Sequence, residues 1–173
     1  EDNVGSTLAK LSQGLPAVIL TSTLIPLLWF FGLHGANLLE AFMSPVYGTL
    51  QTENIQAFAN SNGSIKTLAD GLHGWVRGSW DADVFHGGSG ATLPLLFAII
   101  IVSKVKDHRE IARLGIAPGI FMINEPVLFG LPVVLNPIYL VPFVLNQPIL
   151  ATIAYLATKV GFAGPIVNSV PWT

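Results

Sequence analysis

The sequence predicts an all-α membrane protein in which transmembrane helices are accompanied by re-entrant helical hairpins, and three observations lead to this fold class. The 173 residues are 51% hydrophobic and only 10% charged, whereas a soluble domain carries about 25% charged residues. Residues 15–33 are uncharged and long enough to cross a hydrocarbon core of about 30 Å as a helix. After residue 114, prolines interrupt the apolar sequence too often for one continuous helix.

The first two thirds of the chain alternate between apolar and polar stretches. The first apolar run, residues 15–33, contains Pro26, which we expect to kink its helix. Residues 51–83 are richer in Asn, Gln, Ser and acidic side chains, which predicts a solvent- or cavity-facing region of short helices. A second uncharged run, residues 87–103, ends at the segment 104–113, which holds four of the eight Lys and Arg residues. The positive-inside rule places this basic segment on the cytoplasmic side.

The stretch 114–158 is almost entirely apolar and is punctuated by prolines at positions 118, 126, 132, 137, 142 and 148. We predict a re-entrant or broken-helix hairpin at 115–137, followed by a span over roughly 138–158. Non-helical backbone persists at membrane depth only where protein or a water-filled cavity covers it. Transporters use such broken helices to hold their substrates.

Glu125 is the first candidate functional residue. The 60 residues from Leu114 to Thr173 contain only two charged side chains, Glu125 and Lys159. An ionised carboxylate in apolar surroundings is unfavourable by several kcal/mol unless it is paired, hydrogen-bonded or facing a wet cavity. Glu125 can bind substrate hydroxyls or accept a proton, and it can also cap the N-terminus of a half-helix. The two roles are compatible.

Each of four further residues can have one of two roles. His34, at the end of the first apolar run, is either an interfacial residue or part of a site. Trp172 is either an aromatic of the membrane–water interface or a stacking partner for a sugar ring. Asn124 and Asn136 are amides that either satisfy broken backbone or bind sugar hydroxyls.

Composition and spacing exclude several classes of function. A formal net charge of −2 argues against a nucleic-acid partner, which requires clustered basic surface. The absence of cysteine removes disulfides and a cysteine nucleophile from this chain, and His73 and His86 have no partner at metal-ligand spacing, so we expect no metal site. Residues 87–90, Gly-Gly-Ser-Gly, lack the Lys and the strand–helix context of a P-loop, and we expect no nucleotide or other cofactor. A hairpin tip at a substrate cavity explains these glycines better.

Three segments together resemble a known family. They are Gly-Ile-Phe-Met-Ile-Asn-Glu-Pro-Val-Leu-Phe-Gly-Leu-Pro-Val-Val-Leu-Asn-Pro (119–137), Gly-Leu-His-Gly (32–35) and Gly-Gly-Ser-Gly-Ala-Thr-Leu-Pro-Leu (87–95). The chain resembles the IIC membrane component of the bacterial phosphoenolpyruvate-dependent sugar phosphotransferase system, in its lactose/cellobiose/N,N′-diacetylchitobiose branch. The resemblance covers nearly the whole chain. We therefore expect residues 1–173 to be a partial C-terminal substrate-binding domain of a longer IIC transporter, without a second domain.

The resemblance implies two re-entrant hairpins around a sugar site. It implies that Glu125 and His34 act on the sugar near its 6-hydroxyl, that Asn124 is an amide neighbour in the site, and that Trp172 contacts the sugar. The implied function is the binding and translocation of a β-linked disaccharide of the cellobiose, lactose or diacetylchitobiose type, coupled to phosphorylation of its 6-hydroxyl. The donor is a phosphorylated IIB protein, whose phosphocysteine cannot lie on this cysteine-free chain. We expect IIB to dock near the basic segment 104–113.

The resemblance also implies a multi-pass protein of the bacterial inner membrane, in contact with lipid and dimeric through an N-terminal half that this chain lacks. Because the phosphoryl donor is a partner, the sequence leaves open whether the chain counts as an enzyme. A proton-coupled sugar or metabolite carrier with Glu125 as the coupling residue is the alternative function, and a structural scaffold is a third. The preferred disaccharide and the roles of Asp81, Asp83 and His86 also stay open.

Overall fold

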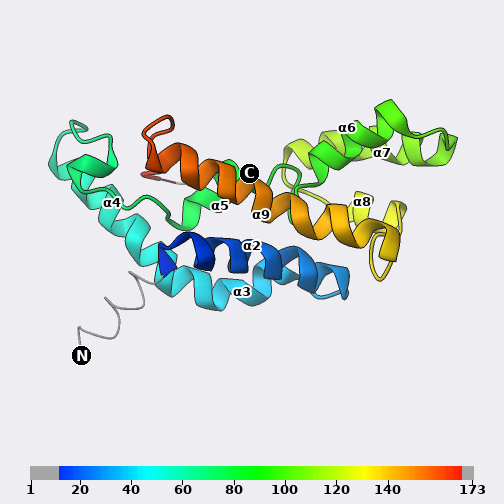
Figure 1. The fold of residues 1–173 in the computed structure, drawn as a ribbon, viewed down its shortest axis with the longest axis horizontal. Coiled ribbons are helices and arrows are strands. Elements are labelled where there is room, and N and C mark those ends of the chain that lie inside the picture. Colours follow the sequence, from blue (N-terminus) through cyan, green and yellow to red (C-terminus); the bar gives the residue numbers. More distant parts are fainter. Residues whose placement is uncertain (1–11, 169–173) are drawn as a thin grey trace. The chain divides into compact units, whose positions relative to one another are not determined.

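The computed structural model describes residues 12–168, which contain helices and no strand. The predicted all-α class is therefore confirmed. In chain order the elements are α2 (Leu15–Phe30), α3 (Gly35–Met43), the π-helix η1 (Ser44–Gly48), α4 (Thr49–Asn60), the 3-10 helix η2 (Leu68–Asp70), α5 (Arg77–Asp83), α6 (Thr92–Val102), α7 (Lys106–Ile120), α8 (Glu125–Gly130) and α9 (Pro137–Lys159), and Figure 1 labels the α-helices.

The breaks expected after residue 114 fall between α7, α8 and α9. The short helix α8 lies within the predicted hairpin 115–137, and α9 covers the predicted span 138–158. Within residues 12–168, α9 is the one helix whose length and apolar composition suffice to cross a membrane, and the apolar helices α2 and α6 are shorter. The expectation of several spans therefore stays a prediction.

The chain divides into two compact units. Within the described part of the chain, the first unit comprises residues 12–21, 39–84 and 149–168, and the second comprises residues 22–38 and 85–148. The three segments singled out by the sequence, 32–35, 87–95 and 119–137, all belong to the second unit.

The second unit is built on a helical hairpin. Helices α6 and α7 pack side by side, joined by residues 103–105, and α8 packs against α7 (Figure 1). The core beneath them is fully buried at Leu96, Val127 and Phe143, which come from α6, α8 and α9. On the outside, Ile101 and Leu114 are 79% and 75% exposed. Large apolar side chains left in contact with solvent are typical of a surface that meets a membrane or a partner.

The first unit contains the polar stretch 51–83. The predicted short helices are present as α4, η2 and α5. The unit nevertheless has a buried aromatic cluster. The ring of Trp80 packs against those of Tyr47 and Trp75, with centroid distances of 4.6 and 5.3 Å, and all three side chains are buried. Asp81 has a structural role there, since its carboxylate accepts a 3.0 Å hydrogen bond from Arg77.

Candidate functional site

His34 is held at the junction between α2 and α3. Helix α2 ends at Phe30. The turn that follows contains Gly32, whose φ is +81°, and in this turn the Leu33 N–H donates a 2.9 Å hydrogen bond to the carbonyl of Leu28. His34 precedes α3, and its Nδ1 accepts a 3.2 Å hydrogen bond from the backbone N–H of Asn37. The ring also packs against Trp29, with centroids 4.5 Å apart. Contacts on both sides therefore fix the imidazole.

The hydrogen bond to Nδ1 determines what His34 can offer a ligand. A ring nitrogen that accepts a hydrogen bond carries no proton, so the proton of the neutral imidazole lies on Nε2. His34 accordingly presents an N–H donor at Nε2. In this state it cannot accept a proton at Nδ1 without losing the bond from Asn37.

Glu125 is the first residue of α8 and is followed by Pro126. Among residues 12–168, its carboxylate has no hydrogen bond or ion pair to any side chain or backbone group. The carboxylates of Glu40, Glu53 and Asp81, in contrast, all pair with a cationic or imidazole side chain. Glu125 is therefore available as a hydrogen-bond acceptor for an incoming molecule.

Asn124 ties two loops together. It is 3% exposed, and its Nδ2 donates a 2.6 Å hydrogen bond to the backbone carbonyl of Ser89. Of its two expected roles, the structure supports the satisfaction of broken backbone. Asn136 has the same type of role, because its Oδ1 accepts the N–H of Ile138 at the start of α9.

The glycine-rich loop 87–90 lies directly against this tie. Gly88 has a φ of +85°, and a Cβ there would lie 2.5 Å from the carbonyl oxygen of Met122 and 3.1 Å from Cβ of Asn124. Only glycine permits both the left-handed backbone and this close approach. The loop and the Asn-Glu-Pro segment are thus packed backbone against backbone.

These elements surround a cavity of about 130 Å³ that is open to the surface and is lined by His34, Ala36, Phe85, Gly88, Ser89, Met122, Asn124 and Glu125. Three of the four predicted site residues therefore share one cavity, although 91 positions separate His34 from Glu125. The fourth, Trp172, lies outside the described residues. Typical ligand pockets measure roughly 300–1,000 Å³, so this cavity can hold only part of a ligand of that size.

The cavity combines one acceptor and one donor. The carboxylate of Glu125 can accept a hydrogen bond or a proton from a hydroxyl, while Nε2–H of His34 can donate to an oxygen. The serine of the loop, Ser89, adds a hydroxyl that the sequence alone did not single out. The available signal was its position inside the Gly-Gly-Ser-Gly segment, where it is the one residue with a polar side chain.

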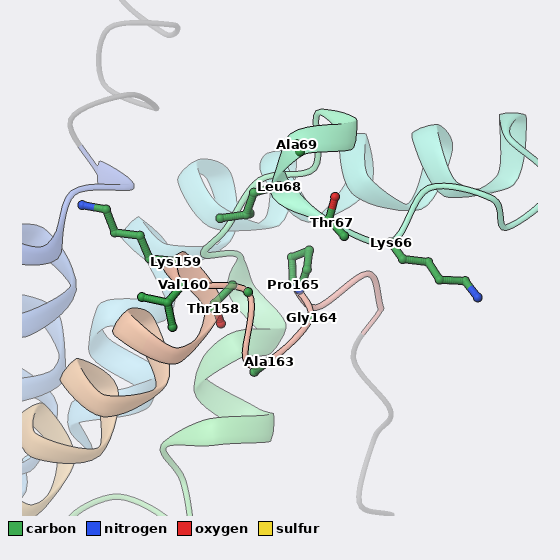
Figure 2. Close-up of a pocket in the computed structure, with 11 residues that line it drawn as sticks. Lys66, Thr67, Leu68, Ala69, Thr158, Lys159, Val160, Ala163, Gly164 and Pro165 are labelled. Atoms are coloured by element: carbon green, nitrogen blue, oxygen red, sulfur yellow. The ribbon is translucent and has the colours of Figure 1, made fainter.

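A larger cavity, of about 250 Å³, lies in the first unit between the end of α9 and residues 66–69 (Figure 2). Its two charged lining residues, Lys66 and Lys159, point away from one another in Figure 2, so their ammonium groups do not converge on a ligand. Nearby, the Asp70 carboxylate accepts hydrogen bonds from the backbone N–H groups of Lys66 and Thr67 and from the Thr67 hydroxyl. These bonds, that from Lys66 foremost, hold the pKa of Asp70 below its usual value. The cavity lined by His34 and Glu125 is therefore the better candidate for a functional site.

Fold and site together describe a helical membrane component with an acidic residue at a helix break. The chain belongs to the EIIC family of the phosphotransferase system: residues 3–146 match the family described as "Phosphotransferase system, EIIC". The branch expected from the sequence is confirmed by its relatives. The chain is 45% identical to the "PTS system cellobiose-specific EIIC component" of Lactococcus lactis subsp. lactis (strain IL1403), over 94% of the chain and 36% of that protein.

Further relatives extend the same branch. The "PTS system oligo-beta-mannoside-specific EIIC component" of Bacillus subtilis (strain 168) is 36% identical, over 98% of the chain and 37% of that protein. The crystal structure of the transporter ChbC, the IIC component from the N,N'-diacetylchitobiose-specific phosphotransferase system, is similar with a TM-score of 0.86 and 33% identity, over 97% of the chain and 38% of that structure. The chain therefore spans little more than a third of the length of these relatives.

Proposed function

We propose that this chain forms the sugar-binding part of a membrane permease of the phosphotransferase system and takes β-linked disaccharides. The observation that carries the proposal is the unpaired carboxylate of Glu125 in the same cavity as the imidazole of His34. The names of its relatives, which are cellobiose-, oligo-beta-mannoside- and N,N'-diacetylchitobiose-specific, support the substrate class.

In this proposal, one end of the disaccharide enters the cavity with its 6-hydroxyl toward Glu125. The carboxylate accepts the hydroxyl proton while Nε2–H of His34 donates to a neighbouring oxygen and fixes the orientation of the sugar. The sugar oxygen then attacks phosphorus, the bond from phosphorus to the cysteine sulfur breaks, and the thiolate leaves with the electron pair. Phosphoryl transfer depends mainly on positioning and on the handling of charge, which this pair of groups supplies.

The phosphoryl donor in this proposal is a IIB protein. The chain contains no cysteine, so the phosphocysteine has to come from a partner. Residues 104–113 form an exposed approach surface for it, with the cationic side chains Lys104, Lys106, Arg109 and Arg113. We further propose a multi-pass inner-membrane location and a homodimer formed through an N-terminal half outside these 173 residues, as the resemblance to this family implies.

The test replaces Glu125 by Gln in the full-length protein and measures sugar uptake and IIB-dependent sugar phosphorylation. Loss of a general base typically lowers the rate about 10²–10⁴-fold, and we expect a decrease in this range for Glu125→Gln. Glu53→Gln is a matched control, because Glu53 also lies beside an imidazole, 2.6 Å from Nε2 of His73, but outside the cavity. Undiminished phosphorylation by Glu125→Gln refutes the assignment, and uptake that depends on the proton gradient rather than on IIB favours the proton-coupled carrier.

A further inference from the structure

Ser89 is the one residue of the cavity lining with a hydroxyl, and no group within residues 12–168 forms a hydrogen bond with that hydroxyl. The residue is 7% exposed and lines the cavity together with His34 and Glu125. The only hydrogen bond that Ser89 makes within residues 12–168 is through its backbone carbonyl, which accepts from Asn124. The residue as a whole is therefore more than nine-tenths buried, and its hydroxyl has no hydrogen-bond partner among residues 12–168.

The neighbouring hydroxyl shows that this is not a general property of the loop. Thr92, three residues later and fully buried, donates a 2.5 Å hydrogen bond to the carbonyl of Gly87. The Ser89 oxygen, in contrast, has no such partner within residues 12–168 and is not among the fully buried polar atoms that lack one, so it is accessible from the cavity. The Thr92 hydroxyl is therefore used to support the turn of the loop, whereas the Ser89 hydroxyl, which lines the cavity, is left without a hydrogen-bond partner within residues 12–168.

The backbone around Ser89 holds it in a fixed place beside the Asn-Glu-Pro segment. On one side, Gly88 packs against Met122, and on the other a Cβ at Gly90 would lie 2.0 Å from the ring of Phe143. Ser89 itself, unlike both flanking glycines, is not in the left-handed region. A larger or smaller side chain at position 89 therefore changes the cavity without straining the backbone.

We propose that the Ser89 hydroxyl is a third polar contact of the cavity and binds a hydroxyl of the sugar end that enters it. This inference rests on the proposed function. Glu125 can only accept and neutral Nε2–H of His34 can only donate, whereas a serine hydroxyl rotates and does both. Ser89 is therefore suited to a second sugar hydroxyl next to the one that Glu125 and His34 take, and it contributes to the choice between sugars that have or lack that hydroxyl.

The experiment measures binding to the full-length protein in detergent by titration calorimetry, with cellobiose and with analogues that each lack one hydroxyl of a terminal sugar. Loss of one net hydrogen bond corresponds to a decrease in affinity of about three- to tenfold, and we expect this for Ser89→Ala with cellobiose. For one analogue, wild type and Ser89→Ala should bind equally, because the partner of Ser89 is then absent from the ligand. The apparent melting temperature without sugar should not fall, since the hydroxyl has no partner in the protein.

Two further variants test whether the effect on binding is specific to the cavity. Ser64→Ala, at an exposed serine outside the cavity, should bind like wild type. Ser89→Val fills part of the roughly 130 Å³ space and should abolish binding while the protein still folds. Wild-type affinity of Ser89→Ala for cellobiose, or an equal loss for every analogue, overturns the role of Ser89. If Glu125→Gln loses sugar phosphorylation while Ser89→Ala keeps wild-type affinity for cellobiose, only the role of Ser89 is refuted. If Glu125→Gln keeps its phosphorylation activity, the proposed function itself is refuted.

Discussion

Replacement of Gly88 by Ala tests whether the loop 87–90 and the Asn-Glu-Pro segment are packed as closely as the structure indicates. Two effects combine in this variant. A non-glycine residue with left-handed backbone is unfavourable by about 1–2 kcal/mol, and Gly88 has a φ of +85°. In addition, the new Cβ would lie 2.5 Å from the carbonyl oxygen of Met122, an atom that cannot rotate away. Overpacking of this kind adds about 1–3 kcal/mol, so we expect a total loss of about 2–5 kcal/mol.

Gly71 provides a matched control. Its φ is +95°, and a Cβ at this position has nothing within 4 Å. Gly71→Ala therefore carries the backbone strain of about 1–2 kcal/mol without the clash. The difference in stability between the two variants measures the close approach alone.

The assay is thermal unfolding of the full-length protein in detergent, followed by calorimetric titration with cellobiose. Gly88→Ala should be less stable than Gly71→Ala, and it should also bind sugar more weakly, because relief of the clash displaces Met122 or Asn124 in the wall of the cavity. Gly71→Ala should retain the affinity of wild type. Equal stability of the two variants, with affinity intact in both, would refute the close packing of the two loops.

Two other predictions concern polar groups away from this contact. Because the folded-state pKa of Asp70 is below its usual value of 3.8, the ionised carboxylate stabilises the fold above pH 3.8, and this stabilisation is lost as the pH falls through the lower folded pKa. The melting temperatures of wild type and Asp70→Asn should therefore differ at neutral pH and converge in acid. A difference that does not change with pH contradicts the assignment. Gln147 is fully buried in α9, and neither of its side-chain polar atoms has a hydrogen-bond partner within residues 12–168. Gln147→Leu should therefore raise the stability by roughly 1–3 kcal/mol, whereas the control Gln56→Leu, at an exposed position, should not. A lower melting temperature for Gln147→Leu would disprove the reasoning.

Several features of this protein could be predicted from the sequence because they depend on neighbours along the chain. The low charge content predicts a membrane protein, and the proline density after residue 114 predicts the breaks around α8. Glu125 stood out because it is one of two charged residues in sixty. Such signals are local, since helix formation and its interruption are decided within a few turns.

The arrangement of the groups that line the cavity depends on contacts between distant segments of the chain. Such contacts cannot be predicted from the periodicity of apolar residues along the sequence. The sequence could not show that the amide of Asn124 is directed to the carbonyl of Ser89, or that Asn37 fixes the tautomer of His34. It also could not show that the hydroxyls of Ser89 and Thr92 differ, one free and the other bound. The role of Trp172 stays a prediction. Sequence alone determined that the chain is helical and that an acid lies at a helix break, whereas tertiary packing decided which groups line the cavity, because hydrogen-bond partners are set by distance in space.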